Sequence, residues 1–289
     1  MKKTLIKSIQ LIAISSVILL AGCSANSSSE QTTASSNGDN TIKVKVAYEL
    51  SGKPMTYQDE NGNAAGYDID VMKLVDEKLE NYEFEYIGTT SDDLLIGVEQ
   101  GKFQVGVKNA FYTEERTKKY IYPQQFIGLS SAGLVLNKDN SDIKSLADFA
   151  NKQFTLAPIA ANNAQYTVID SYNKQHPEQP IQLEAGDTFG VDVVQWVNEG
   201  RVDGGVMIEG SFNKQVTEAD GPYHHLKDNV IFQEFDVIKT WPLFNKKEQQ
   251  FADDYDQAME VIFQSGELQK ISEKHYGRDL FAVLDRVQQ

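Results

Sequence analysis

Apolar side chains recur with two different periods from about residue 41 onward. Ile42, Val44 and Val46 alternate with lysines, which indicates a strand with one buried face. Between Asp68 and Leu79 the apolar residues recur every three or four positions, which indicates an amphipathic helix. Alternation of the two patterns favours an α/β fold with mostly parallel sheets. We expect further strands at 84–86, 103–107, 154–157 and 202–208, and further helices at 91–100, 163–173, 188–198 and, in two segments, between 251 and 271.

The first 40 residues lack this periodicity. Three lysines lie within the first seven residues, and an apolar run follows from Leu11 to Leu20. A charged start, a short apolar run and a small-residue cleavage site are typical of an export signal. The apolar run is about half of the roughly 20 residues that a bilayer span needs. We therefore predict a lipoprotein signal peptide at 1–22 and, because residues 23–40 are rich in Ser and Asn, a flexible tether there.

Cys23 is the only cysteine of the chain, and it ends the motif Leu20-Ala21-Gly22-Cys23. This motif resembles a bacterial lipobox, at which the signal is removed and the cysteine thiol receives diacylglycerol. The alternative is an ordinary signal peptide followed by a chance cysteine. Lipidation implies that the protein is anchored at the extracellular face of the cytoplasmic membrane, in the form typical of Gram-positive bacteria.

Length and charge narrow the function classes. Removal of residues 1–22 leaves 267 residues, a size at which chains commonly divide into two lobes. Removal of the three lysines in that segment moves the formal charge from −15 to −18. Such an acidic chain is not expected to bind nucleic acid, because that binding needs Lys and Arg against phosphates. Nor is it expected to lie flat on an anionic membrane.

No catalytic or metal-binding motif stands out, so we expect a protein that is not an enzyme and that carries no cofactor. A nucleophile elbow, a phosphate-binding Gly-rich loop and a His-Glu-x-x-His motif are all missing from the sequence. The adjacent pair His224-His225 is interpreted as a polar loop rather than a metal site, since neighbours in sequence rarely converge on one ion.

An ordered set of segments resembles the extracellular solute-binding proteins of polar amino acid ABC importers. The resemblance spans residues 42–280, and its specificity lies in the order and spacing of the segments. The segments are KPMTYQDENGNAAGYDIDVMKLV (53–75), SDDLLIGVEQGKFQVGV (91–107), TEERTKKYIYP (113–123), NEGRVDGGVMIEGS (198–211) and QSGELQKISEKHYG (264–277).

The resemblance implies a two-lobe periplasmic-binding-protein type II fold, with a ligand cleft between the lobes and two hinge strands near 133–137 and 231–238. Lobe 1 would comprise residues 41–135 and 238–289, and lobe 2 residues 136–237. The implied function is capture of an extracellular amino acid, by a monomer, for the permease of an ABC importer. Two alternatives stay open: a sensor or adhesin that feeds no transporter, and an enzyme on the same fold.

Arg116 lies in the family's T-x-E-R motif, whose arginine grips the α-carboxylate of the ligand. A guanidinium suits this role because its planar fork binds a carboxylate with two parallel hydrogen bonds. The alternative is a surface arginine that pairs with Glu114 or Glu115. Thr113 is interpreted as the N-cap of the short helix that carries Arg116.

The resemblance also implies a second carboxylate contact and an acidic partner for the ligand ammonium. Ala161, Asn162 and Asn163 stand where family members offer backbone N–H groups at a helix start, although a plain capped helix explains them equally well. Glu209 and Glu49 match the acidic positions. Glu209 requires one extra residue in its strand, and the alternative for it is an exposed strand-end glutamate.

The chain departs from the family just before Arg116. Asn109 and Phe111 stand where many members have a glycine and a hydroxyl residue. Tyr48, Phe111 and Tyr112 are expected either to line a pocket for an apolar or sulfur-containing side chain or to pack between the lobes. The cystine-binding branch of the family departs at the same place, which makes cystine a candidate ligand.

Overall fold

A computed structural model describes residues 41–161, 163–186 and 192–283. The predicted signal peptide, the tether with Cys23, and the site residue Asn162 lie outside the described residues. Within those ranges, every helix is too short or too polar to cross a membrane.

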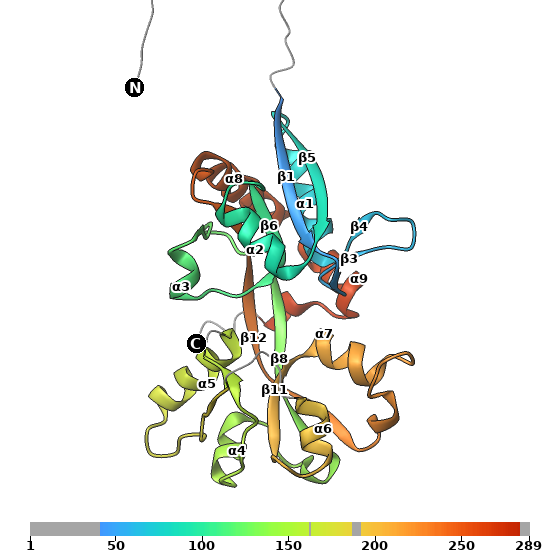
Figure 1. Ribbon diagram of the computed structural model, residues 1–289, viewed down its shortest axis with the longest axis vertical. Helices are drawn as coiled ribbons and strands as arrows, with labels where there is room; N and C mark the ends of the chain where they lie inside the picture. The colour runs from blue at the N-terminus through green and yellow to red at the C-terminus, as the bar shows by residue number, and fades with distance from the viewer. Residues whose placement is uncertain (1–40, 162, 187–191, 284–289) are drawn as a thin grey trace, which may run out of the picture. The chain divides into compact units, whose positions relative to one another are not determined.

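Seven strands of the described residues form one sheet, in the order β11-β8-β12-β6-β1-β5 with β7 against β12 (Figure 1). β1 pairs in parallel with β5 and β6, whereas β12 is antiparallel to β6, β7 and β8, and β11 is antiparallel to β8. The sheet is therefore mixed, and the expectation of mostly parallel sheets is wrong. The strands are β1 (Ile42–Glu49), β5 (Tyr82–Thr89), β6 (Val105–Ala110), β7 (Tyr120–Ile121), β8 (Gly128–Asn137), β11 (Gly204–Ile208) and β12 (Val230–Asn245).

One lobe is built around β1, β5 and β6, whose side chains alternate between two faces. Val44 and Val46 of β1 point into a core shared with three helices, while Ala47 packs on the other face against α2. This alternation confirms the strand that the period-2 pattern predicts. The helices of this lobe are α1 (Tyr67–Lys78), α2 (Ser91–Glu99), α3 (Glu114–Thr117), α8 (Gln249–Ser265) and α9 (Glu267–Tyr276), and a hairpin comprises β2 (Ser51–Gly52), β3 (Thr56–Gln58) and β4 (Ala64–Ala65).

The other lobe surrounds the far ends of β8 and β12 together with β11. Leu134 and Leu136 of β8 face a core with α4 and α5, and Val135 between them faces a second core with α6 and α7. The other elements of this lobe are β9 (Ile159–Ala160), β10 (Ala185–Gly186), α4 (Leu146–Asn151), α5 (Ala164–Gln175), α6 (Val193–Asn198), α7 (Glu209–Phe212), the π-helix η2 (Asn213–Thr217) and the 3-10 turns η1 (Lys138–Asn140) and η3 (His224–Leu226). One more 3-10 turn, η4 (Leu280–Val283), follows α9 and belongs to the first lobe.

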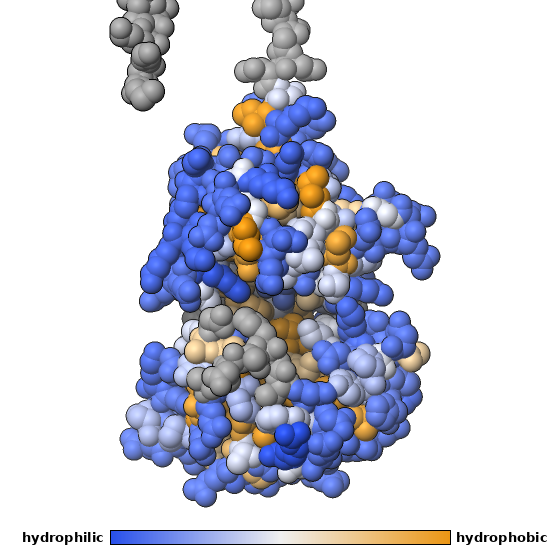
Figure 2. All heavy atoms as spheres, viewed as in Figure 1, coloured by the Kyte–Doolittle hydropathy of each residue, from blue (hydrophilic) through white to orange (hydrophobic). Residues whose placement is uncertain are grey.

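Strands β8 and β12 run from one lobe into the other. β12 pairs with β8 from Val230 to Thr240 and with β6 from Trp241 to Phe244, and its register shifts between Glu234 and Asp236. Hydrophilic residues cover most of the face in Figure 2, and apolar residues show in the hollow between the lobes. The lobe boundaries at 135 and 238 stay a prediction.

Thr90 caps α2, since its hydroxyl accepts a hydrogen bond from the Asp93 N–H. One local prediction needs correction. The strand expected at 154–157 is reduced to a single bridge at Leu156, and the regular strand comes later, as β9. The helix expected at 188–198 is described only as α6, since residues 187–191 lie outside the described ranges.

Candidate ligand-binding cleft

Two charged side chains meet at the carboxyl ends of β1 and β6. The strands are parallel neighbours with Tyr48 opposite Val107, so Glu49 and Lys108 leave the sheet at the same edge. Lys108 Nζ lies 4.0 Å from Glu49 Oε2, and the lysine side chain is only 15% exposed. Burial lowers the pKa of Lys108, Arg116 acts in the same direction, and Glu49 opposes the change. This edge therefore holds a poorly solvated cation.

Arg116 is held at the start of α3 by local hydrogen bonds. Thr113 Oγ1 accepts a hydrogen bond from the Arg116 N–H at 3.2 Å, which confirms Thr113 as the N-cap. The guanidinium donates to the Phe111 carbonyl at 3.0 Å, and the Tyr122 hydroxyl donates to the same oxygen at 2.8 Å. Both bonds fix the loop between β6 and α3.

No carboxylate of the described residues lies within 4.0 Å of the Arg116 side-chain nitrogens, so neither Glu114 nor Glu115 neutralises it. Arg116, Lys108 and Glu49 line one cavity of about 590 Å³. Asp92, Glu99 and Glu115 line it too, and Glu99 pairs with Lys119 at 3.3 Å. The guanidinium is thus a fixed cation without an acidic partner in the part of the chain that the structure describes.

The turn after β6 depends on a left-handed residue. Asn109 has φ 54°, a conformation that glycine adopts freely and asparagine tolerates better than most residues. Its N–H donates to Asp68 Oδ2 at 2.9 Å, and its Oδ1 accepts from the Ser130 hydroxyl at 2.6 Å. Burial raises the pKa of Asp68 to about 7, partly offset by the Asn109 hydrogen bond. Asn109 therefore holds a left-handed backbone geometry that glycine would adopt more freely.

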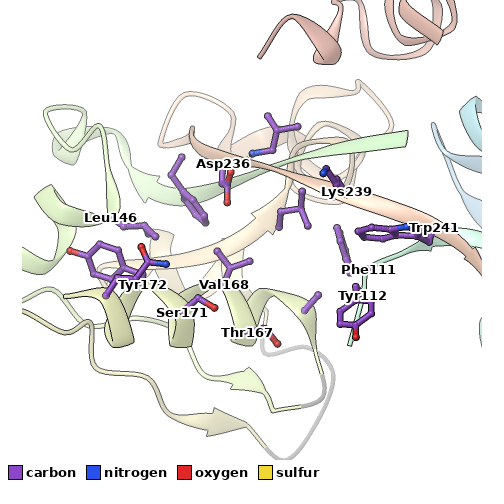
Figure 3. Close-up of a pocket in the computed structure, with 15 residues that line it drawn as sticks. Phe111, Tyr112, Leu146, Thr167, Val168, Ser171, Tyr172, Asp236, Lys239 and Trp241 are labelled. Carbon is purple, nitrogen blue, oxygen red and sulfur yellow. Dashed lines mark hydrogen bonds between the residues drawn. The ribbon is translucent and has the colours of Figure 1, made fainter. Parts of the chain in front are cut away.

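A second cavity, of about 620 Å³, lies between the Phe111–Tyr112 loop, helix α5 and strand β12 (Figure 3). Phe111, Tyr112 and Trp241 lie together on one side of it, and Thr167, Val168, Ser171 and Tyr172 face them from α5. Tyr112 is 49% exposed, and its ring centroid lies 6.2 Å from that of Trp241. Two of the three aromatic residues of the predicted site, Phe111 and Tyr112, thus line this cavity, and Tyr112 also packs against Trp241 of β12.

Glu49 and Lys108 also line a third cavity, of about 640 Å³, which lies between the β2–β3 hairpin and the α7–η2 segment. Lys214 of η2 donates to the Ser51 carbonyl at 2.9 Å across this space. The edge of β1 and β6 consequently faces cavities on two sides.

Glu209 is not brought together with Arg116. The pairing of β11 with β8 runs unbroken from Gly204 to Ile208, and Glu209 lies directly after it. Glu209 instead begins α7 and accepts a hydrogen bond from Arg278 at 2.7 Å. Glu209 lines none of the three cavities described above.

For two further predicted site residues, the observed contacts favour the structural alternative. Tyr48 is 2% exposed, belongs to the core under β1 and lines none of the three cavities described above. The Asn163 N–H donates to the Ala160 carbonyl at 2.8 Å, and its Oδ1 accepts from the Gln165 N–H at 3.1 Å. Asn163 is therefore a plain helix cap. Ala161, two positions earlier, is exposed.

Three residues at or near these cavities, Lys108, Trp241 and Arg278, were not predicted from the sequence. Lys108 directly follows the apolar residues 105–107 of a predicted strand, and a charged residue at the end of a strand is a signal that could have identified it. Trp241 and Arg278 carry no local signal, because only long-range packing brings them here. In the ranges that the structure describes, no three His, Cys, Asp or Glu side chains gather as a metal ion would require.

Comparisons with known proteins agree with this architecture. The profile of the bacterial extracellular solute-binding proteins, family 3, matches residues 44–278. The chain is 28% identical over 225 residues to the L-cystine-binding protein TcyJ of Bacillus subtilis (strain 168), covering 78% of this chain and 80% of that protein. It is 26% identical over 291 residues to the L-cystine-binding protein TcyA of the same strain, covering 97% and 99%.

Solved structures show the same fold. The probable amino-acid ABC transporter extracellular-binding protein ytmK from Bacillus subtilis matches with a TM-score of 0.65 at 20% identity, covering 82% of this chain and 98% of that chain. This likeness confirms the two-lobe α/β fold of the periplasmic-binding-protein type.

Proposed function

The chain belongs to the bacterial extracellular solute-binding proteins, family 3, and from this premise we propose that it captures an amino acid and delivers it to the permease of an ABC importer. L-cystine is the proposed ligand, since two relatives are L-cystine-binding proteins. The observation that carries the proposal is the Arg116 guanidinium, which lines a cavity beside Lys108 and Glu49 and has no carboxylate partner among the described residues.

The proposed grip on the ligand follows from these charges. Arg116 binds the α-carboxylate with two charge-assisted hydrogen bonds. Lys108 adds a second positive charge, and its partial burial strengthens its interaction with an anion. Glu49 accepts the α-ammonium from the same cavity. A zwitterionic head group therefore finds both of its partners on one lobe.

The aromatic cavity is the proposed place for the rest of the ligand. Phe111, Tyr112 and Trp241 offer ring faces and edges, which interact favourably with the soft sulfur atoms of a disulfide. Thr167 and Ser171 on α5 supply hydroxyl groups for a polar distal end. Binding to both lobes would favour the closed state of the protein.

Lipidation at Cys23 is the proposed means of keeping the protein at the extracellular face of the membrane. A Cys23→Ser variant is expected to lose the lipid mass and to appear in the medium instead of the membrane fraction. Retention of this variant in the membrane fraction would contradict the anchor.

Uptake of radiolabelled L-cystine by cells that lack the protein tests the transport role. We expect the intact protein to restore uptake, Arg116→Ala to fail, and the matched control Lys118→Ala, an exposed cation on the same short segment, to succeed. If the purified protein binds L-cystine but cells that lack it take up L-cystine normally, a sensor or adhesin role would be supported instead. Conversion of the bound compound to a product would support an enzyme.

A further inference from the structure

Asp236 offers a carboxylate that has no cationic partner among the described residues. It lies on β12 just after the register shift that follows Glu234, and its side chain is half-buried. No ion pair of the described residues includes it. Burial raises the pKa of Asp236, the Val237 N–H opposes this change by donating to Oδ1 at 2.7 Å, and the charge of Glu234 adds to it. The protein itself therefore compensates this charge poorly.

Asp236 lines the aromatic cavity between the Phe111–Tyr112 loop, α5 and β12. In Figure 3 it lies on β12, and Thr167 and Ser171 lie across the cavity on α5. Their hydroxyl groups are able to accept hydrogen bonds, as the carboxylate is. The rings of the same cavity attract a cation by their faces. The lining thus suits a cation that also carries N–H donors.

The basic side chain of this lining does not neutralise Asp236. Among the described residues that line the cavity, only Lys239 is basic. Its Nζ lies 5.1 Å from the centroid of the Phe126 ring, which belongs to a core cluster of the first lobe. This cation–π contact holds the ammonium against the ring instead. The negative charge of Asp236 is consequently left for a ligand.

One loop joins this cavity to the cavity that holds Arg116. Tyr112 lines the aromatic cavity, and the next residue, Thr113, lines the cavity of Arg116. Phe111 links the two directly, because its carbonyl accepts a hydrogen bond from the Arg116 guanidinium at 3.0 Å while the same residue lines the aromatic cavity. A ligand held at Arg116 by its α-carboxylate therefore reaches the aromatic cavity across this loop.

We propose that Asp236 binds a second ammonium group at the far end of the ligand, so that the cleft selects amino acids with an amino group at each end. This inference rests on the proposed function, whose candidate ligand, L-cystine, carries its second amino group beyond the disulfide. An ammonium has three N–H donors, which Asp236 and the hydroxyls of Thr167 and Ser171 are placed to accept. The hydrogen bond to the carboxylate is charge-assisted and supplies the cation that Asp236 lacks.

Calorimetric titration with two disulfides tests this contact. One is L-cystine, and the other is the mixed disulfide of L-cysteine and 3-mercaptopropionic acid, which keeps both carboxylates but lacks the second amino group. We expect the wild type to bind the mixed disulfide about ten-fold more weakly than L-cystine, because one charge-assisted hydrogen bond is lost. Asp236→Asn keeps an oxygen for the Val237 N–H. This variant should bind L-cystine about ten-fold more weakly than the wild type does, and the mixed disulfide equally well.

Asp170→Asn is the matched control. Asp170 lies on α5 as well, but its carboxylate pairs with Lys174 and the residue is not part of the cavity lining. This variant is expected to bind both disulfides like the wild type. If Asp236→Asn leaves the affinity for L-cystine unchanged, or weakens both disulfides equally, the proposal is overturned. Should Asp236→Asn fail to fold, the wild type decides alone, and equal affinity for the two disulfides overturns the proposal.

Arg116→Ala separates this inference from the proposed function. It removes the contact with the α-carboxylate that both disulfides share, so both are expected to bind more weakly. If it weakens both while Asp236→Asn does not distinguish them, the inference about Asp236 is wrong and the capture function stands. If it weakens neither, the proposed capture site is wrong, and the inference falls with it.

Discussion

Replacement of Arg116 by alanine removes the group on which the proposed ligand site depends. The guanidinium keeps one hydrogen bond to the Phe111 carbonyl and has no ion pair with a described residue. Its loss therefore breaks little inside the protein. Any large change in ligand affinity would come from the lost contact with the ligand rather than from unfolding.

The expected magnitude follows from the two hydrogen bonds that a guanidinium fork makes to a carboxylate. Each hydrogen bond to a charged group contributes about 1.5–3 kcal/mol. Lys108 keeps its positive charge beside the same cavity and offsets part of the loss. We expect a net loss of about 3 kcal/mol in binding free energy, which is about a 100-fold rise in Kd.

Isothermal titration of L-cystine into the wild type and the variants measures this change. Arg116→Lys keeps the charge but loses the fork, so we expect an intermediate rise of about ten-fold in Kd. Lys118→Ala, the matched control, is expected to bind like the wild type. A Kd for Arg116→Ala within about three-fold of the wild type would refute the carboxylate assignment.

Three further predictions concern the framework of the site. Because burial raises the pKa of Asp68 from 3.8 to about 7, the folded state retains a proton that the unfolded chain releases, and stability falls as the pH rises across that window. Asp68→Asn should abolish this fall, measured as urea midpoints at about pH 4 and about pH 8. Gly66→Ala should destabilise the protein by more than about 3 kcal/mol, since Gly66 has φ +119° and the new Cβ would clash with the Met55 carbonyl oxygen. Gly200→Ala is the matched control: Gly200 has φ +68° but open space around it, so this change should cost about 1–2 kcal/mol. Thr113→Ala should lower the free energy of unfolding by about 1 kcal/mol, and it should weaken ligand binding because the cap positions Arg116. Thr113→Ser keeps the capping hydroxyl and should retain both the stability and the ligand affinity of the wild type, as thermal unfolding and calorimetry would show.

Much of the fold could be predicted from local patterns. The helix expected at 68–79 is observed as Tyr67–Lys78, and the apolar alternation of Val44 and Val46 marks β1 correctly. The antiparallel half of the sheet could not be predicted, because it depends on β12 pairing with strands about 100 residues earlier in the chain. Such pairing leaves no periodic signal within the strand itself.

The residues of the candidate site likewise divide into those with a local sequence signal and those placed by long-range contacts. Arg116 and its cap Thr113 lie within one short motif, so the sequence was able to indicate both. The contact between Glu209 and Arg278 joins residues 69 positions apart, and an ion pair at that separation has no sequence signature. For Tyr48 the sequence left two interpretations open, because a strand-end aromatic residue has the same sequence pattern whether it faces a cavity or the core.

Thermal unfolding of the purified protein, first unfolded and refolded to strip any carried-over ligand, tests the central claim most directly. The panel would contain the twenty amino acids, L-cystine and short peptides. A ligand at 100 times its Kd should add about 2.7 kcal/mol to the free energy of unfolding and raise Tm by a few degrees. We predict such a shift with L-cystine, and a much smaller one in Arg116→Ala. The absence of a shift across the whole panel would contradict amino acid capture.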